Sequence, residues 1–463
     1  MTQNLKQMKR HSVFLICIFF LQVQEIVSAQ DDDLKLKFSG YLLTDQRFLL
    51  KAPNNWAWNE NRLSLKLDKK FRNDKGKFHT EVWVRNLGLP NIYKGADLYN
   101  KGIVDPVTFE IREAYVQLYG FLSKNLDMKV GRQRIAWGTA DMVNPTDNLN
   151  PYDMEDVLDF SRHRGSDAIN LEYYFNSDFS IQGIYIPVFQ PANLPVGIFA
   201  DALTPVPELP PPYTLEEFND NIDMPKYTIG ESSTYGLKFR GFAGGIDFSL
   251  SYVWGRDGFP TPEYTTITQG ENPGGLNIDV NSIFFRQNIF GADLATNIGG
   301  IGFWAEAAAF LPQDEVVMTT DLTAVIPGLT MDSVVLKKEV FVKFVIGGDY
   351  NFANGMYLNF QYLHGFVGER GRGNLNDYFF TQYQMKFFED RLKLSPVAGA
   401  FIVSDWSDIP NNYAVIYAPQ ISYMATDNLE IELSTPLFFG KGDSMFAKLT
   451  DYSMFMFRLK YSF

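Results

Sequence analysis

The residues best suited to chemistry lie in one segment, 131–165, which reads GRQRIAWGTADMVNPTDNLNPYDMEDVLDFSRHRG. Its carboxylates and arginines suit mutual pairing, because the guanidinium fork matches a carboxylate in geometry. Two Asn-Pro steps between them favour turns, and turns make a loop compact. We expect the carboxylates of the segment to pair with its arginines. The carboxylates are Asp141, Asp147, Asp153, Glu155, Asp156 and Asp159, and the arginines are Arg132, Arg134, Arg162 and Arg164.

No arrangement typical of catalysis accompanies these charges. Beyond residue 29 the chain has three histidines, His79, His163 and His364. His163 lies between two arginines and has no nucleophile beside it, and His364 has no serine or aspartate spaced to suggest a dyad. The sequence has no G-x-S-x-G motif, no metal-ligand spacing and no phosphate-binding loop. We therefore expect no enzyme, no cofactor and no metal.

The composition narrows the class of protein. The chain has 463 residues, 46% of them apolar and 15% aromatic, and a net charge of −13. An acidic chain with a pI near 4.9 is not expected to bind nucleic acid. No run of 18 apolar residues occurs, which excludes a bundle of membrane-spanning helices.

Residues 1–29 are typical of a secretory signal peptide. Lys6, Lys9 and Arg10 form a positive start, nine apolar residues follow, and Val27-Ser28-Ala29 offers a cleavage site. The single cysteine, Cys17, lies inside this segment, so the expected mature chain has no disulfide.

From residue 34 onward, apolar and polar residues alternate with the period of a β-strand. Clear examples are 63–68, 169–175, 235–240, 248–254 and 429–434. Soluble β-sandwiches also alternate, but their strands usually have about 5–6 residues. The segments here have about 10–14 residues, long enough for a tilted membrane strand of about 9–11 residues.

Connections between these segments alternate strictly between short and long, which is typical of an up-and-down membrane barrel. Eight short turns and nine long loops give 17 connections and therefore 18 strands. Pro396, Pro419 and Pro436 fall inside expected strands, where we expect bulges or strand ends. A barrel of 16 strands stays open for this reason. The predicted fold is all-β, a single transmembrane antiparallel barrel over residues 30–463.

The chain finishes with aromatic or apolar residues at every second position. This pattern resembles the C-terminal signal that the insertion machinery of bacterial outer-membrane barrels recognises. It predicts the bacterial outer membrane as location, with its lipid and that machinery as partners. The residues of the signal are Phe455, Phe457, Leu459, Tyr461 and Phe463.

A barrel of 16–18 strands is wide enough for a water-filled channel. The polar residues of the alternating pattern would line it, and they carry both signs of charge, so neither an anion nor a cation pore is indicated. The expected lining residues are Arg62, Lys66, Glu81, Arg85, Lys238, Arg240, Glu430, Glu432 and Arg458.

Segment 131–165 also supports a family resemblance. Its G-R-Q-x-I-x-W-G start, followed by N-P-T-D and N-P-x-D, resembles a group of bacterial outer-membrane barrels catalogued as domain of unknown function 1302, near the alginate-export type of barrel. The resemblance implies a porin-like barrel that passes small, often apolar or carboxylated, compounds.

We therefore expect a channel for small solutes, with 138–165 folded inward as the constriction. The alternative is a non-conducting scaffold or adhesin whose external loops bind a partner. The proline-rich loop 188–231 either covers the external mouth or decorates the cell surface. The identity of the solute, the direction of flow and the oligomeric state stay open.

Overall fold

The computed structural model describes residues 36–463 except 52–54, 72–73, 91 and 204–208. The expected signal peptide, 1–29, lies outside the described residues. Within them, no helix has both the length and the apolar character needed to cross a membrane.

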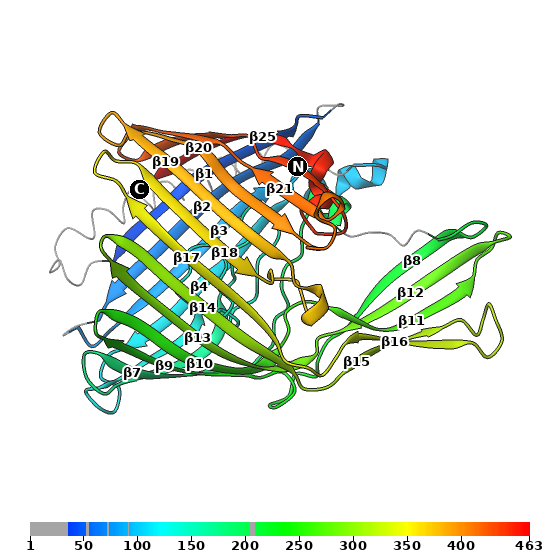
Figure 1. Cartoon of the computed structure of the whole chain (residues 1–463), viewed down its shortest axis with the longest axis horizontal. Helices are drawn as coiled ribbons and strands as arrows, with labels where there is room; N and C mark the ends of the chain where they lie inside the picture. The colour runs from blue at the N-terminus through cyan, green and yellow to red at the C-terminus, as the bar shows by residue number, and fades with distance from the viewer. Residues whose placement is uncertain (1–35, 52–54, 72–73, 91, 204–208) are drawn as a thin grey trace, which may run out of the picture.

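The strands form one closed antiparallel barrel in which neighbours in the chain are neighbours in the wall (Figure 1). The sheet has 20 hydrogen-bonded segments, and two pairs of segments are halves of one interrupted strand, so the wall has 18 strands. The first nine are β1 (Lys37–Leu49), β2 (Trp56–Lys70), β3 (Gly76–Leu87), β4 (Val107–Leu118), β5 (Leu126–Gln133), β6 (Ser166–Tyr174), β7 (Phe179–Ile186), β9 (Thr234–Ala243) and β10 (Ile246–Arg256).

The second half of the wall continues the same up-and-down order. The predicted number of strands, 18, is confirmed. The remaining segments are β13 (Arg286–Ile298), β14 (Ile301–Pro312), β17 (Phe341–Asn351), β18 (Tyr357–His364), β19 (Asp377–Phe387), β20 (Leu392–Val403), β21 (Tyr413–Tyr417) with β22 (Gln420–Thr426), β23 (Leu429–Ser434) with β24 (Leu437–Lys441), and β25 (Met454–Ser462).

The first and last strands close the ring. β1 pairs with β25 from Tyr41 opposite Ser462 to Leu49 opposite Met454. The backbone N–H of Gly40 donates to the carbonyl of Phe463 at 2.9 Å. Closure removes the unpaired edges that a sheet cannot expose to hydrocarbon.

Side chains are arranged in the opposite way to those of a soluble protein. Leu42, Leu250 and Phe290 are each at least half exposed on the outer face of the wall. Charged side chains such as Glu60 and Arg62 are buried inside it. The alternation in the sequence therefore sorts apolar residues outward and polar residues inward, as in membrane barrels.

The three strand prolines lie at irregularities, as expected. Pro419 separates β21 from β22, and Pro436 separates β23 from β24. Pro396 lies in β20 where the register between Tyr383 and Met385 of β19 shifts. Proline lacks an N–H, so it interrupts the hydrogen-bond ladder of the wall.

Three connections expected as plain loops instead contribute to a second, five-stranded sheet that extends away from one end of the barrel (Figure 1). The expected barrel strand after 277 begins only at Arg286 as β13. Parallel pairing between different loops holds this sheet together, since β8 pairs with β12 and β11 with β15. Its strands are β8 (Thr214–Asp223), β11 (Thr261–Gln269), β12 (Gly275–Ile283), β15 (Val316–Asp321) and β16 (Thr330–Leu336).

Candidate pore constriction

The segment between β5 and β6, residues 134–165, folds into the barrel and contacts the wall at widely separated strands. Thr146 donates to Glu306 on β14, through its N–H at 2.7 Å and its hydroxyl at 2.8 Å. Asp141 accepts from Asn359 on β18 at 2.8 Å. Asp156 accepts from Arg47 on β1 at 2.9 Å. Because these strands lie far apart around the ring, the segment crosses the lumen.

Arg47 and Asp156 form the most deeply buried of these contacts. The Arg47 guanidinium donates two bonds to Asp156, at 2.9 and 2.5 Å, and two to Asp45, at 2.9 and 2.7 Å. Arg458 of β25 donates to Asp45 at 2.6 Å. Burial opposes ionisation of Asp156, but Arg47 outweighs it and holds the pKa of that carboxyl well below its usual range.

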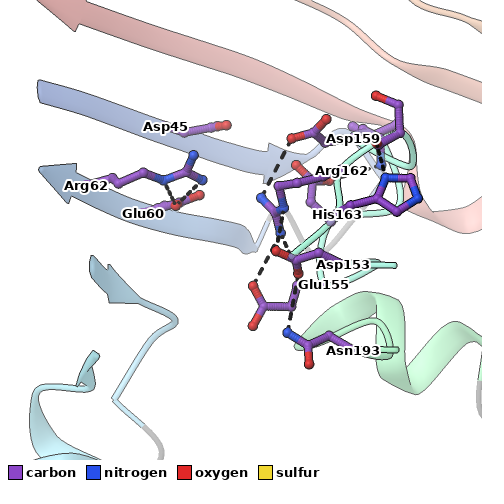
Figure 2. Close-up of polar contacts among 12 residues, drawn as sticks. Asp45, Glu60, Arg62, Asp153, Glu155, Asp159, Arg162, His163 and Asn193 are labelled. Atoms are coloured by element: carbon purple, nitrogen blue, oxygen red, sulfur yellow. Dashed lines mark hydrogen bonds and ion pairs between the residues drawn. The ribbon is translucent and has the colours of Figure 1, made fainter. Parts of the chain in front are cut away.

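A second cluster joins the loop to β3 and β4. Asp153 accepts from Arg112 of β4 at 2.9 Å and from Arg162 of the loop at 3.2 Å, and Figure 2 shows the contact with Arg162. Glu155 accepts from Arg162 at 3.3 Å and from Arg85 of β3 at 2.8 Å. Burial alone would raise the pKa of Asp153, but Arg162 and Arg112 outweigh burial and lower it to about 2.

The wall behind these clusters is basic over five adjacent strands. Each strand from β25 through β1 and β2 to β4 contributes one inward arginine to it. Glu60 and Glu110 lie between these arginines, with Glu60 2.7 Å from Arg62 and 3.0 Å from Arg85. The loop therefore presents carboxylates to a wall of guanidinium groups. The arginines are Arg458, Arg47, Arg62, Arg85 and Arg112.

Trp83 of β3 packs against two arginines of this basic wall. The guanidinium carbons of Arg62 and Arg112 lie 4.0 and 4.1 Å from the centroid of its ring. The indole N–H donates to Glu81 at 2.8 Å. Cation–π contacts of this kind stabilise each buried arginine by about 1–2 kcal/mol and fix its plane.

The start of the loop is held by a different set of contacts. Arg134 donates to Asp147 at 3.0 Å and to Asn150 at 3.1 Å. Gly138 has φ +94°, and a Cβ there would lie 2.5 Å from Oε2 of Glu306. Only glycine therefore fits where the chain turns against that carboxylate.

Histidine 163 lies at the return of the loop. Its ring packs against Tyr152, with centroids 4.2 Å apart, and contacts Arg134 at 3.3 Å. Burial lowers the pKa of His163, so the ring is neutral at pH 7.

The structure brings together most of the residues that were expected to pair. Arg134 meets Asp147, and Arg162 meets Asp153. Asp141 contacts the wall rather than an arginine, and the Arg164 guanidinium donates to the carbonyl of Pro191.

The position of Arg132 is a correction, because its side chain does not lie in the lumen with the other residues that were expected to pair. It shares the face of Val130 on β5, which is outward, and it pairs with the exposed Asp167 at 3.2 Å. A strand places residues two apart on the same face, so Arg132 cannot point into the lumen with Gln133.

The expected lining residues lie on the inner wall in several pairs. Lys66 is 3.2 Å from Glu81, Lys238 is 3.9 Å from Asp293, and Arg458 is 3.5 Å from Glu432. Ser422 donates to Glu430 at 2.5 Å. Arg62 and Arg85 belong to the basic wall, and Arg240 lies on β9 two residues from Lys238.

Sequence reasoning missed part of the site. Six further residues face the lumen. The alternation of their strands indicates this direction, but it does not indicate which residues of the loop they contact. The missed residues are Asp45, Arg47, Glu60, Glu110, Arg112 and Glu306.

A cavity of about 280 Å³ remains between the loop and the basic wall. Side chains of both signs of charge make up most of its lining, with Leu43 as the one aliphatic residue among them, so the cavity suits water and polar solutes. Its lining includes Tyr41, Asp45, Arg62, Asp159, Arg162, Glu432, Arg458 and Lys460.

One group inside the lumen has the spacing of a metal site. Ligand atoms of His79, Glu81 and Glu113 lie within 4.8 Å of one another. Glu81 already accepts from Ser64 at 2.9 Å and from Trp83, and it pairs with Lys66. These donors satisfy the carboxylate without a cation.

Comparison with known proteins places the chain. Among solved structures it is similar in barrel shape to OmpF of Salmonella typhi in complex with daunomycin, with a TM-score of 0.42 and 9% identity over 94% of this chain and 99% of that one. In-vitro folded OmpT, an outer membrane protein of Vibrio cholerae, gives a TM-score of 0.41 and 11% identity over 94% and 99%. A search of curated protein sequences finds no significant match. A family model matches residues 68–415, three quarters of the chain, and so the chain belongs to the family described as "Protein of unknown function (DUF1302)".

Proposed function

We propose that this chain is a bacterial outer-membrane channel through which small solutes diffuse, and that the inward segment 138–165 narrows it. The observation that carries the proposal is the crossing of the lumen by that segment, fixed at β1, β4, β14 and β18. A porin-type constriction needs such a loop, because an 18-stranded barrel is too wide to discriminate between small solutes by itself.

The charge arrangement supports passage of polar or carboxylated solutes past the constriction. Acidic loop residues face a wall of arginines across a cavity of about 280 Å³. Opposed charges across a narrow, partly desolvated passage create a strong transverse field, which orients solutes that carry a dipole or a carboxylate.

The location that we propose is the outer membrane, with export by the segment 1–29 and its removal. The outward apolar face of the wall and the alternating aromatic residues of β25 support contact with lipid and with the insertion machinery. Tyr461 and Phe463 are among the exposed aromatic residues of that end.

Planar-bilayer recording tests the channel. Purified protein is expected to give discrete conductance steps, and a variant lacking residues 139–160 is expected to give larger ones. If the intact chain gives no steps, the channel is refuted. If the deletion leaves the conductance unchanged, the loop is not the constriction.

A second candidate function rests on the five-stranded external sheet, which extends away from the barrel (Figure 1). Its outer strands, β8 and β16, leave backbone groups on one side without a sheet neighbour among the described strands. Such edges suit the addition of a partner strand. A scaffold of this kind gives no conductance, so the same recording separates the two functions.

A further inference from the structure

Three adjacent strands of the wall carry a proline at the same height. Pro396 lies in β20, Pro419 between β21 and β22, and Pro436 between β23 and β24. The neighbouring outward residues Val397 and Leu433 are apolar and exposed, so these prolines lie within the apolar belt of the barrel.

Side-chain hydroxyl groups replace part of the interrupted backbone ladder. Tyr417 donates through its hydroxyl to the carbonyl of Pro396 at 2.9 Å, and Ser434 donates to that of Pro419 at 3.1 Å. The N–H of Phe438 donates to the hydroxyl oxygen of Ser453 at 3.0 Å. Side-chain hydroxyl groups therefore take part in bonds that a continuous ladder would form between backbone groups alone.

The ladder is weakest between β24 and β25. Among the described strands, β24 pairs along its length only with β21, while β25 pairs with β1 and β23. One backbone bond, from the N–H of Met454 to the carbonyl of Pro436 at 3.0 Å, joins the two sides at the start of β24. The wall therefore has a seam here, defined by Pro436–Lys441 on one side and Ser453–Met454 on the other.

On the inner side of the seam, apolar side chains take the place of the ladder. The short 3-10 helix η7 (Ala447–Tyr452) packs against β24. Phe446 and Leu449 are fully buried beside Phe438 in the largest apolar cluster of the molecule's described part. Apart from the bonds of Met454 to Pro436 and of Phe438 to Ser453, these apolar contacts close the seam.

A cavity of about 280 Å³ lies directly behind these strands. Its walls are mainly apolar, in contrast to the charged cavity next to it, with which it shares Glu432 and Arg458. The lining residues include Leu158, Phe160, Phe380, Ile416, Pro436, Phe446 and Met456.

We propose that the seam is a side exit, through which neutral apolar molecules pass from this cavity into the hydrocarbon of the membrane. Irregular backbone at membrane depth is tolerated where it lines a cavity or is covered by protein, and both conditions hold here. Transfer of an apolar molecule from the water-filled lumen into the lipid beyond the seam lowers its free energy, whereas movement along the lumen leaves it in water. The inference rests on the proposed channel function, because the molecule must first enter the lumen.

A removable covalent bond across the seam tests this route. By continuation of the β23–β25 register, Leu437 lies opposite Ser453, so the double variant Leu437→Cys/Ser453→Cys can form a disulfide. The only natural cysteine is Cys17, in the expected signal peptide, so no other thiol of the mature chain interferes. The matched control is Ala292→Cys/Ala307→Cys, which joins two directly paired alanines of the continuous wall between β13 and β14.

The probe is N-phenyl-1-naphthylamine, a neutral apolar dye that fluoresces once it enters hydrocarbon. In cells that produce the oxidised seam variant, we expect dye uptake at least fivefold slower than in cells with the unaltered chain, and recovery after reduction. The control variant is expected to take up dye at the unaltered rate in both states.

Conductance of the same purified variants separates this inference from the channel itself. We expect oxidation of the seam to leave ion conductance unchanged, because ions follow the wet lumen. Unaltered dye uptake by the oxidised seam variant would overturn the side exit and leave the channel standing. An equal loss in the control variant would also overturn it, while absence of conductance in every variant would refute the channel instead.

Discussion

Arg47 and Asp156 face each other through two hydrogen bonds, although 109 residues separate them in the chain. Arg47 is 0% exposed and Asp156 3% exposed. A buried ion pair contributes little net stability over an apolar pair, yet removal of one partner leaves an uncompensated charge. The position of the loop therefore depends on the ion pair between its Asp156 and Arg47 of β1.

Replacement of Asp156 by Asn leaves Arg47 with one carboxylate fewer in a buried site. Loss of one partner of such a pair costs about 3–5 kcal/mol. We expect the loop to detach locally, with larger and noisier conductance steps in planar bilayers. Asp167→Asn, which breaks the outer-surface pair with Arg132, is the control, and an equal effect of both variants would contradict the prediction.

Loss of the Asp153 ion pairs should make the conductance depend on pH in the acid range. The pKa of Asp153 is lowered to about 2, so its pairing stabilises the loop fully above its unfolded value of about 3.9. That stability is lost as the pH falls from about 4 to 2. We expect the single-channel conductance, measured at successive pH values, to rise as the pH falls from about 4 to 2. An unchanged conductance over this interval would contradict the role of Asp153.

Gly138 turns the loop against Glu306, and its φ of +94° disfavours any other residue. Gly138→Ala adds a Cβ 2.5 Å from the carboxylate oxygen and is expected to destabilise the loop by about 1–3 kcal/mol. The readout is the temperature at which the folded band disappears in heat-modifiability gels, together with conductance. Gly183→Ala, where a Cβ meets nothing within 4 Å, serves as the matched variant and should leave both unchanged.

Arg85 contacts three carboxylates, those of Glu60, Glu110 and Glu155. Arg85→Gln removes the positive charge among them, so the passage becomes more negative and should favour cations. The reversal potential in a KCl gradient measures this change, with an expected shift of about twofold or more in the permeability ratio. Arg132→Gln, on the outer face, should not move it.

Much of the fold could be predicted from the sequence, because strand alternation and turn length are local properties. The 18 strands and the inward or outward sense of most side chains follow from them. The position of Arg132 could have been predicted too, since Leu126, Met128 and Val130 mark its face as apolar. The expectation was wrong because it followed proximity to the loop instead of strand parity.

The rest of the site could not be predicted, because it depends on contacts between distant residues. The pairing of Asp156 with Arg47, and of Thr146 with Glu306 across 160 residues, requires the ring to be closed first. The external sheet was missed for a related reason. Its parallel pairs join strands from different loops, and neither strand alone indicates its partner.

The five-stranded sheet links the loops at the end of the barrel from which it extends, and this affects how that end responds to force. The strands come from three successive loops, those after β7, β10 and β14, and each loop is bonded to another through β8–β12 or β11–β15. A protease cut in any one of them would leave the severed strand attached by its neighbours. We therefore expect the three loops to move together. A force applied to the five-stranded sheet is then shared by the six barrel strands from which the loops extend.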